Sequence, residues 1–245
     1  MLGLMASLLT QADVARLLAE PSAAVRAEVA DKLAREIDSP VLGEAELQIA
    51  NDILRIMAKD VELTVRSALS ASLRAARRLP HDVAMRLAND IEAVALPILS
   101  DSPVLTEGDL VELVGGGSSR KQEAIAGRSD VSEAVADAVT RQGSEEAVAA
   151  LLANAQARVA EASLGIVIDR FADSDRVKTT MVHRAGLPVT IAERLVTMVS
   201  DNLQSYLVRH HDLPVNRSFH CRAAVHSRGR CRPASTRMWE RSNVN

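Results

Sequence analysis

Apolar residues recur at helical spacing along most of the chain, and the clearest pattern begins at a Leu-Pro pair. Residues 79–87 read Leu-Pro-x-x-Val-x-x-x-Leu, residues 187–195 repeat the pattern with Ile in place of Val, and residues 131–139 carry a weaker copy that begins Val-Ser. Pro and Ser are favoured where helices begin, and the four-residue spacing places the following apolar side chains on one helical face. A helix start that recurs in this way predicts a helical repeat protein.

The same spacing and start signals predict helices over most of the remaining sequence. Thr10 and Asp13 resemble a capping box, and Ser39-Pro40 interrupts an apolar stripe that begins after Pro21. A further helix is expected to begin at Asp60. The other expected helices span residues 10–20, 21–37, 44–59, 120–126, 132–141, 144–154, 158–171, 174–184, 188–200 and 201–211.

Self-matches within the chain suggest the type of repeat. The spacing of Val25, Val29 and Leu33 returns 40 residues later, which falls in the period of HEAT and armadillo units. Residues 94–114 align with residues 148–168, which is an offset of 54. Because the two offsets differ, we predict an all-α fold, a degenerate HEAT/armadillo-like α-solenoid of stacked helix pairs.

Composition breaks suggest four regions. Gly115-Gly116-Gly117-Ser118-Ser119 is the clearest internal break, so we expect an N-terminal repeat block over 1–114, a Gly/Ser linker over 115–119 and a second block over 120–214. Residues 215–245 form an irregular basic tail. Leu213-Pro214 has the pattern of another helix start, but no apolar residues at helical spacing follow it.

The tail differs from the body in charge and in residue types. Residues 216–245 contain seven Arg and one acid, a net charge of +6, which leaves −9 for residues 1–215. They lack Leu, Ile and Lys but hold both cysteines and the only Trp. This composition is typical of a GC-rich reading frame read out of register, so we expect a disordered or frameshifted end. A natural basic tail and an unusual terminal cap are the alternatives.

Composition also limits the compartment and the class of protein. Hydrophobic residues make up 47% of the chain but aromatic residues only 2%, which suits close-packed helices of Ala, Leu, Val and Ile. No apolar run approaches the roughly 20 residues of a membrane span, and residues 1–9 lack the basic region of a signal peptide. The body contains no cysteine. We therefore predict a cytoplasmic protein without disulfides in its body.

Four segments together resemble a known family. They are Arg-Ala-Gly-Leu-Pro at 184–188, Arg-Ser-Asp-Val at 128–131, Leu-Leu-Ala-Asn at 151–154, and residues 206–214. The combination resembles an uncharacterised, mainly alphaproteobacterial family, domain of unknown function 2336, over roughly residues 10–214. The resemblance implies that further helices follow the equivalent of Pro214. It implies no activity, cofactor or catalytic residue.

Two groups of residues are candidates for ligand binding. Residues 115–121, Gly-Gly-Gly-Ser-Ser-Arg-Lys, could attract an anion at a helix start, but they lack the P-loop spacing, so a linker is favoured. His210, His211 and Asp212, with His183 nearby, are metal-ligand types. Adjacent helical residues point about 100 degrees apart, which favours a solvated helix end instead.

The tail and the helix starts supply the remaining candidates. His220, Cys221, His226 and Cys231 match no common zinc spacing. Arginines recur near helix starts, and we expect them to bond carbonyls or acids of the neighbouring unit, with a ligand-binding ladder as the alternative. These arginines are Arg26, Arg66, Arg128 and Arg184. Asp52 and Asp90, in a repeated Asn-Asp, are likewise expected to make contacts between repeats.

No catalytic constellation can be assembled from these residues, so we predict no catalytic, cofactor-binding or metal-binding residue and no enzyme. The favoured function is a non-catalytic scaffold or adaptor for another protein, and the acidic body favours a partner with a basic surface. Nucleic-acid binding is the first alternative, but the acidic body offers only Phe171 and Tyr206 as aromatic residues. A helical-repeat enzyme or enzyme-assembly factor is the second.

Overall fold

The computed structural model describes residues 22–40 and 43–211, and within these ranges the regular structure is helical, without a strand. The predicted helix at 10–20 and the tail at 215–245 lie outside the described residues. The helices are α2 (Ala23–Glu36), α3 (Glu44–Met57), α4 (Leu63–Leu73), α5 (His81–Ala88), α6 (Glu92–Asp101), α7 (Glu107–Gly116), α8 (Ser119–Ala126), α9 (Glu133–Gln142), α10 (Glu145–Ala153), α11 (Glu161–Arg170), α12 (Asp175–Val182), α13 (Val189–Val196) and α14 (Asp201–His210).

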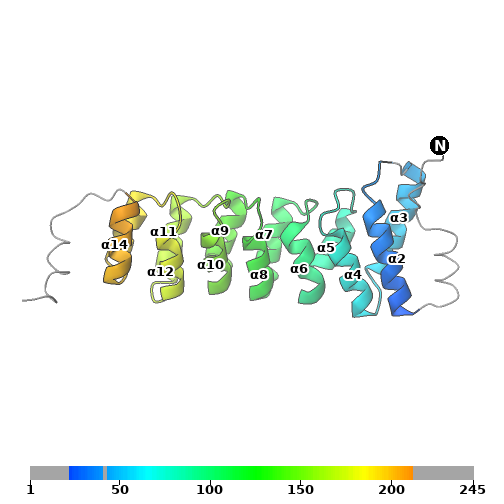
Figure 1. Cartoon of the computed structure of the whole chain (residues 1–245), viewed down its shortest axis with the longest axis horizontal. Coiled ribbons are helices and arrows are strands. Elements are labelled where there is room, and N and C mark those ends of the chain that lie inside the picture. Colours follow the sequence, from blue (N-terminus) through cyan, green and yellow to red (C-terminus); the bar gives the residue numbers. More distant parts are fainter. Residues whose placement is uncertain (1–21, 41–42, 212–245) are drawn as a thin grey trace, which may run out of the picture.

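The helices form two layers that run along one elongated row (Figure 1). In the even layer, each of α2, α4, α6, α8, α10 and α12 packs against the next even-numbered helix. In the odd layer, α7 packs against α9, α9 against α11 and α11 against α13. The prediction of an all-α solenoid is therefore confirmed. No helix among the described residues has the length and apolar character needed to cross a membrane.

Cap residues explain why the short helices begin where they do. The side-chain oxygens of Ser22, Thr106, Ser132, Ser144 and Ser174 each accept a hydrogen bond from a backbone N–H in the first helical turn. Such a cap satisfies one of the N–H groups that a helix start leaves without an intrahelical partner. Helices of eight to fourteen residues depend on these caps and on packing, because isolated helices of this length are marginal in water.

The recurring Leu-Pro motif is a start signal of the odd layer. Pro80 and Pro188 are the N-cap residues of α5 and α13, and Ser132 is the N-cap residue of α9. The apolar residue before each cap is buried, as is Leu105 before the Thr106 cap of α7. An apolar residue in this position fixes the angle at which the chain enters the helix. The motif thus marks every second unit in the odd layer.

The repeat period is shorter than either offset found in the sequence. Consecutive odd-layer helices from α5 onward begin 26 to 28 residues apart, and even-layer helices from α4 onward begin 26 to 30 residues apart. The 54-residue match between residues 94–114 and 148–168 is wrong as a single period, because it spans two units and passes over α8. The 40-residue offset holds only between α2 and α4, since α3 is longer than the later odd-layer helices.

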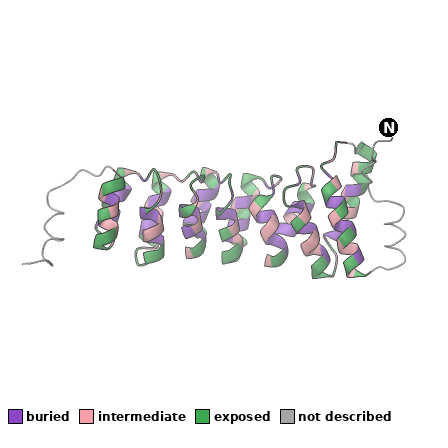
Figure 2. Ribbon diagram, in the orientation of Figure 1, coloured by how far each residue is buried: buried purple, intermediate pink, exposed green. Residues whose placement is uncertain are grey.

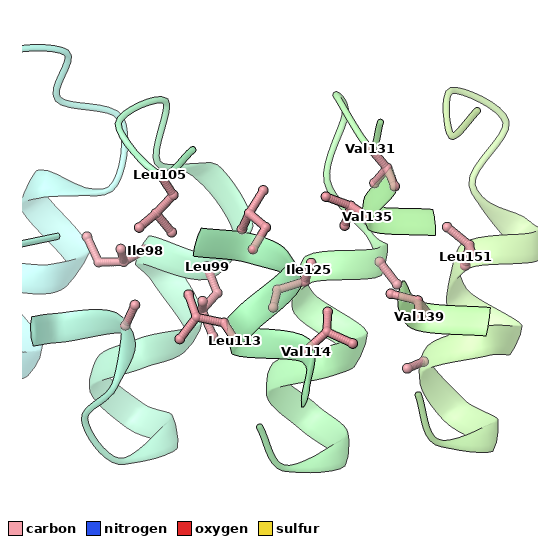
Figure 3. Packing of buried hydrophobic residues seen from close by; sticks show 14 of the residues in the cluster. Ile98, Leu99, Leu105, Leu113, Val114, Ile125, Val131, Val135, Val139 and Leu151 are labelled. Carbon is pink, nitrogen blue, oxygen red and sulfur yellow. The ribbon is translucent and has the colours of Figure 1, made fainter. Parts of the chain in front are cut away.

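One hydrophobic core follows the whole row. Buried residues of both layers form a single cluster from Val29 to Leu207, and buried positions recur in every helix pair (Figure 2). In the centre, Leu99 of α6, Leu113 of α7, Ile125 of α8 and Leu151 of α10 belong to this same cluster (Figure 3). Each unit therefore buries its apolar face against its neighbours, as in other solenoids.

The predicted linker at 115–119 is a close turn between two packed helices. Gly115 and Gly116 complete α7, Gly117 is its C-cap, Ser118 is the N-cap of α8, and Ser119 is the first residue of α8. A Cβ atom at Gly117 would lie 2.6 Å from the carbonyl oxygen of Leu113. The glycine is thus required by the close approach of backbone, and the hydrophobic cluster continues on both sides of the turn.

Candidate functional site

Two of the recurring arginines join consecutive even-layer units through carboxylates. The Arg26 guanidinium donates to both carboxylate oxygens of Asp60, at 2.7 and 3.0 Å, and Arg66 donates to both oxygens of Asp90, at 2.6 and 3.1 Å. Arg66 also donates to the carbonyl oxygen of Asp60 at 2.7 Å. The hydrogen bond from Arg26 holds the pKa of the Asp60 carboxyl below its ordinary value. These fork-shaped pairs fix the spacing between units.

The other two arginines bind carbonyl groups at the ends of helices. Arg128 is buried and donates to the carbonyl oxygens of Leu99 and Ser102, both at 2.9 Å, at the end of α6. Arg184 donates to four carbonyl oxygens at and after the end of α10; they belong to Leu151, Leu152, Asn154 and Ala157. The prediction that these arginines bond acids or carbonyls of the neighbouring unit is confirmed.

Several further side chains make the same kind of contact, and sequence reasoning missed them. Each donates to a carbonyl at the C-terminal end of a helix one unit earlier. They are Arg86 to Ala58, Lys121 to Ala88, Asn154 to Ala126, Arg170 to Thr140 and His211 to Val182. The last carbonyls of a helix lack intrahelical partners and carry its partial negative charge, so cationic donors stabilise them. A backbone acceptor has no residue type, which is why no sequence signal identified these pairs.

The two aspartates of the repeated Asn-Asp, Asp52 and Asp90, make different contacts. Asp90 accepts from Arg66 of the preceding even-layer helix, as predicted. Asp52 instead accepts from Arg55 within the same helix, and it is Arg55 that reaches the next unit, at Asp82. The prediction was wrong for Asp52 because α3 is long enough to supply its own partner three residues on.

Two polar side chains beside the glycine-rich turn, Ser118 and Lys121, bind groups of the preceding unit. Lys121 points toward the end of α5, where its Nζ donates to the carbonyl oxygens of Ala88 and Asp90. At the start of α8, Ser118 donates its hydroxyl to the carboxylate of Glu92 at 2.6 Å. A carboxylate already stands near this helix start, and its charge would repel a second anion.

The histidines near the C-terminal end of the described residues bind separate carbonyls. His210 Nδ1 lies 3.1 Å from the Tyr206 carbonyl oxygen, and His211 Nε2 lies 2.9 Å from that of Val182. The Tyr206 ring lies between the rings of His183 and His210, with centroid distances of 4.4 and 4.1 Å. The two adjacent histidines therefore do not converge, and Asp212 lies outside the described residues.

The remaining candidates are the possible metal ligands and the aromatic residue Phe171. Among the described residues there is no group of three or more His, Cys, Asp or Glu side chains placed to hold a metal ion. His220, Cys221, His226 and Cys231 lie outside the described residues. The Phe171 ring is covered by the guanidinium of Arg170, 4.8 Å from its centroid.

Two hollows on the surface are lined by charged side chains that mostly bind other groups of the protein. A hollow of about 600 Å³ near the end of α5 contains three cations and three carboxylates, among them the Arg66–Asp90 pair. A hollow of about 490 Å³ beside α8 contains Arg128, which is held by carbonyls and by Asp130. Most of the charged groups in these two hollows bind other charged side chains or backbone carbonyls.

A third hollow, which we call the α9–α11 groove, has a different lining. It measures about 550 Å³ and lies at the N-terminal ends of odd-layer helices; its lining residues are Glu107, Ser132, Glu133, Ala134, Asp137, Arg158, Ala160, Ala162 and Ser163. Glu107 and Glu133 are exposed, whereas Asp137 is held by Ser163 at 3.0 Å and Arg141 at 2.7 Å. Three carboxylates face one cation, Arg158, over alanine methyl groups.

The residues of the groove are suited to binding a cationic group rather than to catalysing a reaction. Its excess of carboxylates favours a positively charged group, and the alanines let a backbone or an aliphatic stem approach closely. Sequence reasoning missed this surface because its residues come from three units, and neither alanine nor a first-turn glutamate is distinctive in a helical chain.

Comparison with known proteins identifies a family but no function. No curated protein and no solved structure matches the chain. A family described as "Uncharacterised protein conserved in bacteria (DUF2336)" matches residues 94–237, from the start of α6 into the basic tail. Since this match covers more than half of the sequence, the chain belongs to the DUF2336 family of uncharacterised bacterial proteins.

Proposed function

We propose that the chain is a non-catalytic scaffold that binds a basic segment of another protein in the α9–α11 groove. The observation that carries this proposal is the groove itself, in which Glu107 and Glu133 are exposed beside Asp137 above an alanine floor. Elsewhere in the described part of the chain, the recurring arginines are used in contacts between units. Of the groove carboxylates, Asp137 is bonded by Ser163 and Arg141, whereas Glu107 and Glu133 are exposed.

Charge supports the choice of partner. Residues 1–215 carry a net charge of −9, so a basic partner is attracted over the whole body as well as at the groove. Solenoids commonly use an extended side surface for protein binding, which fits a partner segment lying across successive helix starts.

Affinity capture with the full chain as bait tests the proposal. We expect Glu107→Lys combined with Glu133→Lys to lose a protein that the wild-type chain retains, because the groove then repels a basic segment. Glu193→Lys, an equally exposed charge reversal on α13, is the matched control and should retain it. Equal retention by both variants would contradict the groove, and capture that nuclease treatment abolishes would indicate nucleic acid instead.

A further inference from the structure

Helix α3 exposes an apolar stripe at the N-terminal end of the row. Ile49 is 62% exposed and Ile56 is 71% exposed, while Ile53 between them is partly buried. Residues four and seven apart lie on one side of a helix, so the three isoleucines share a face. No other described helix exposes two isoleucines in this way.

The odd layer shows which way this face points. In α13, Thr190 and Arg194 are the second and sixth residues after the N-cap, and they contact Glu161 and Asp169 of the preceding helix, α11. In α11 the third residue, Ser163, is buried and donates to Asp137 of the preceding odd-layer helix, α9. The side that contains the second and sixth residues therefore faces the odd-layer helix one unit earlier.

Side chains on a different face reach forward. Asp137, the fifth residue of α9, accepts from Ser163 of α11, and Glu161, the first residue of α11, accepts from Thr190 of α13. These positions are rotated by about 100 degrees from the sixth and second residues. Arg55, the twelfth residue of α3, continues this forward side and binds Asp82 of α5.

By the same count, the isoleucine stripe of α3 lies on the side that faces the preceding unit. Counting from the N-cap Gly43, Ile49 is the sixth residue, and Ile53 and Ile56 continue the same side. They face the position that an odd-layer helix of an earlier unit would occupy. Among the described residues no helix precedes α2, and α3 lies at that end of the row (Figure 1).

We infer that the segment 1–21 of the same chain is the occupant of the isoleucine stripe. Chain order supports this occupant, because every odd-layer helix from α3 to α13 directly precedes an even-layer helix, and residues 1–21 directly precede α2. The segment also has a suitable stripe, Val14, Leu17 and Leu18, after the Thr10 start signal. This inference is independent of the α9–α11 groove.

Thiol labelling in the full chain tests the inference. In a Cys221→Ser, Cys231→Ser background, a single Ile56→Cys substitution reports access to the stripe, and Val189→Cys, on α13 at the other end, is the matched control. We expect maleimide to label position 56 about tenfold more slowly than position 189, because a covered thiol reacts only when its cover opens.

Adding Val14→Ser, Leu17→Ser and Leu18→Ser should raise the labelling rate at position 56 by about tenfold and leave position 189 unchanged. Leu17→Ser alone should give a smaller rise, which guards against misfolding of the triple variant. Equal rates at position 56 with and without these substitutions would overturn the inference. Protection that grows with protein concentration would also overturn it, because a second copy would then be the cover.

Discussion

Single polar side chains set the distance and angle between successive units of this solenoid. Arg184 alone donates to four carbonyl oxygens around the end of α10, and Arg128 serves the end of α6 in the same manner. The sequence identified both residues because arginine recurs near helix starts. It did not identify their acceptors, since the hydrogen bonds go to backbone groups that depend only on how the helices stack.

Replacing Arg184 with Met should destabilise the protein by about 2–4 kcal/mol, because half-buried carbonyls lose their donor. Arg184→Lys should recover only part of the loss, since an ammonium group lacks the planar fork that serves several acceptors. Burial lowers the pKa of the Arg184 guanidinium, which shows that its charge is partly desolvated in this contact. Denaturant unfolding measures the difference, with the exposed Arg120→Ala as the control; equal effects of the two variants would contradict this role.

The Arg26–Asp60 pair predicts part of the acid sensitivity. The pKa of Asp60 is lowered from 3.8, chiefly by its hydrogen bond from Arg26. A carboxyl with a depressed folded-state pKa stabilises fully above its unfolded pKa, and this stabilisation is lost as the pH falls through the folded pKa. Asp60→Asn should therefore reduce the loss of unfolding free energy on going from about pH 6 to about pH 3. An unchanged loss would show that the pair contributes nothing.

At the scale of the element, the start signals and most helix lengths were predictable, and the clearest exception is α13, which ends at Val196 although it was predicted to run to residue 200. Ser132, Ser144 and Ser174 begin helices where the sequence indicated, because a hydroxyl cap acts within one turn. The glycine run at 115–117, predicted as part of a linker, forms the end and the C-cap of α7. Its composition fits a flexible segment, but close contact between the Gly117 position and the Leu113 carbonyl gives it a packed role.

Two neighbouring glycines in this turn should respond oppositely to alanine. Gly117→Ala should cost about 1–3 kcal/mol, because its Cβ would lie 2.6 Å from a backbone oxygen. Gly116→Ala, at the end of α7 with nothing within 4 Å of its Cβ, should be neutral or stabilise by up to about 1 kcal/mol. Thermal unfolding of both variants decides the point. Two neutral substitutions would be the result expected of a flexible linker.

At the scale of the whole molecule, the apolar periodicity predicted the solenoid fold, but it did not predict the number of residues in each repeat. The 54-residue self-match passed over a unit, and the cap residue varies between Pro, Thr, Ser and Ala along the odd layer. Nor could the α9–α11 groove be found in sequence, because Glu107 and Arg158 come together only through the stacking of three units. The groove can therefore be located only on the assembled row and not in any single helix.

The salt dependence of partner binding tests the scaffold function most directly. Once a protein captured by the wild-type chain is purified, its Kd is measured between about 50 and 500 mM salt, a range over which screening strengthens markedly. For the wild-type chain we predict affinity that falls steeply with salt, and for Glu107→Lys with Glu133→Lys a weaker affinity that depends less on salt. A partner that binds both chains with the same Kd and the same salt dependence would contradict the α9–α11 groove as its binding site.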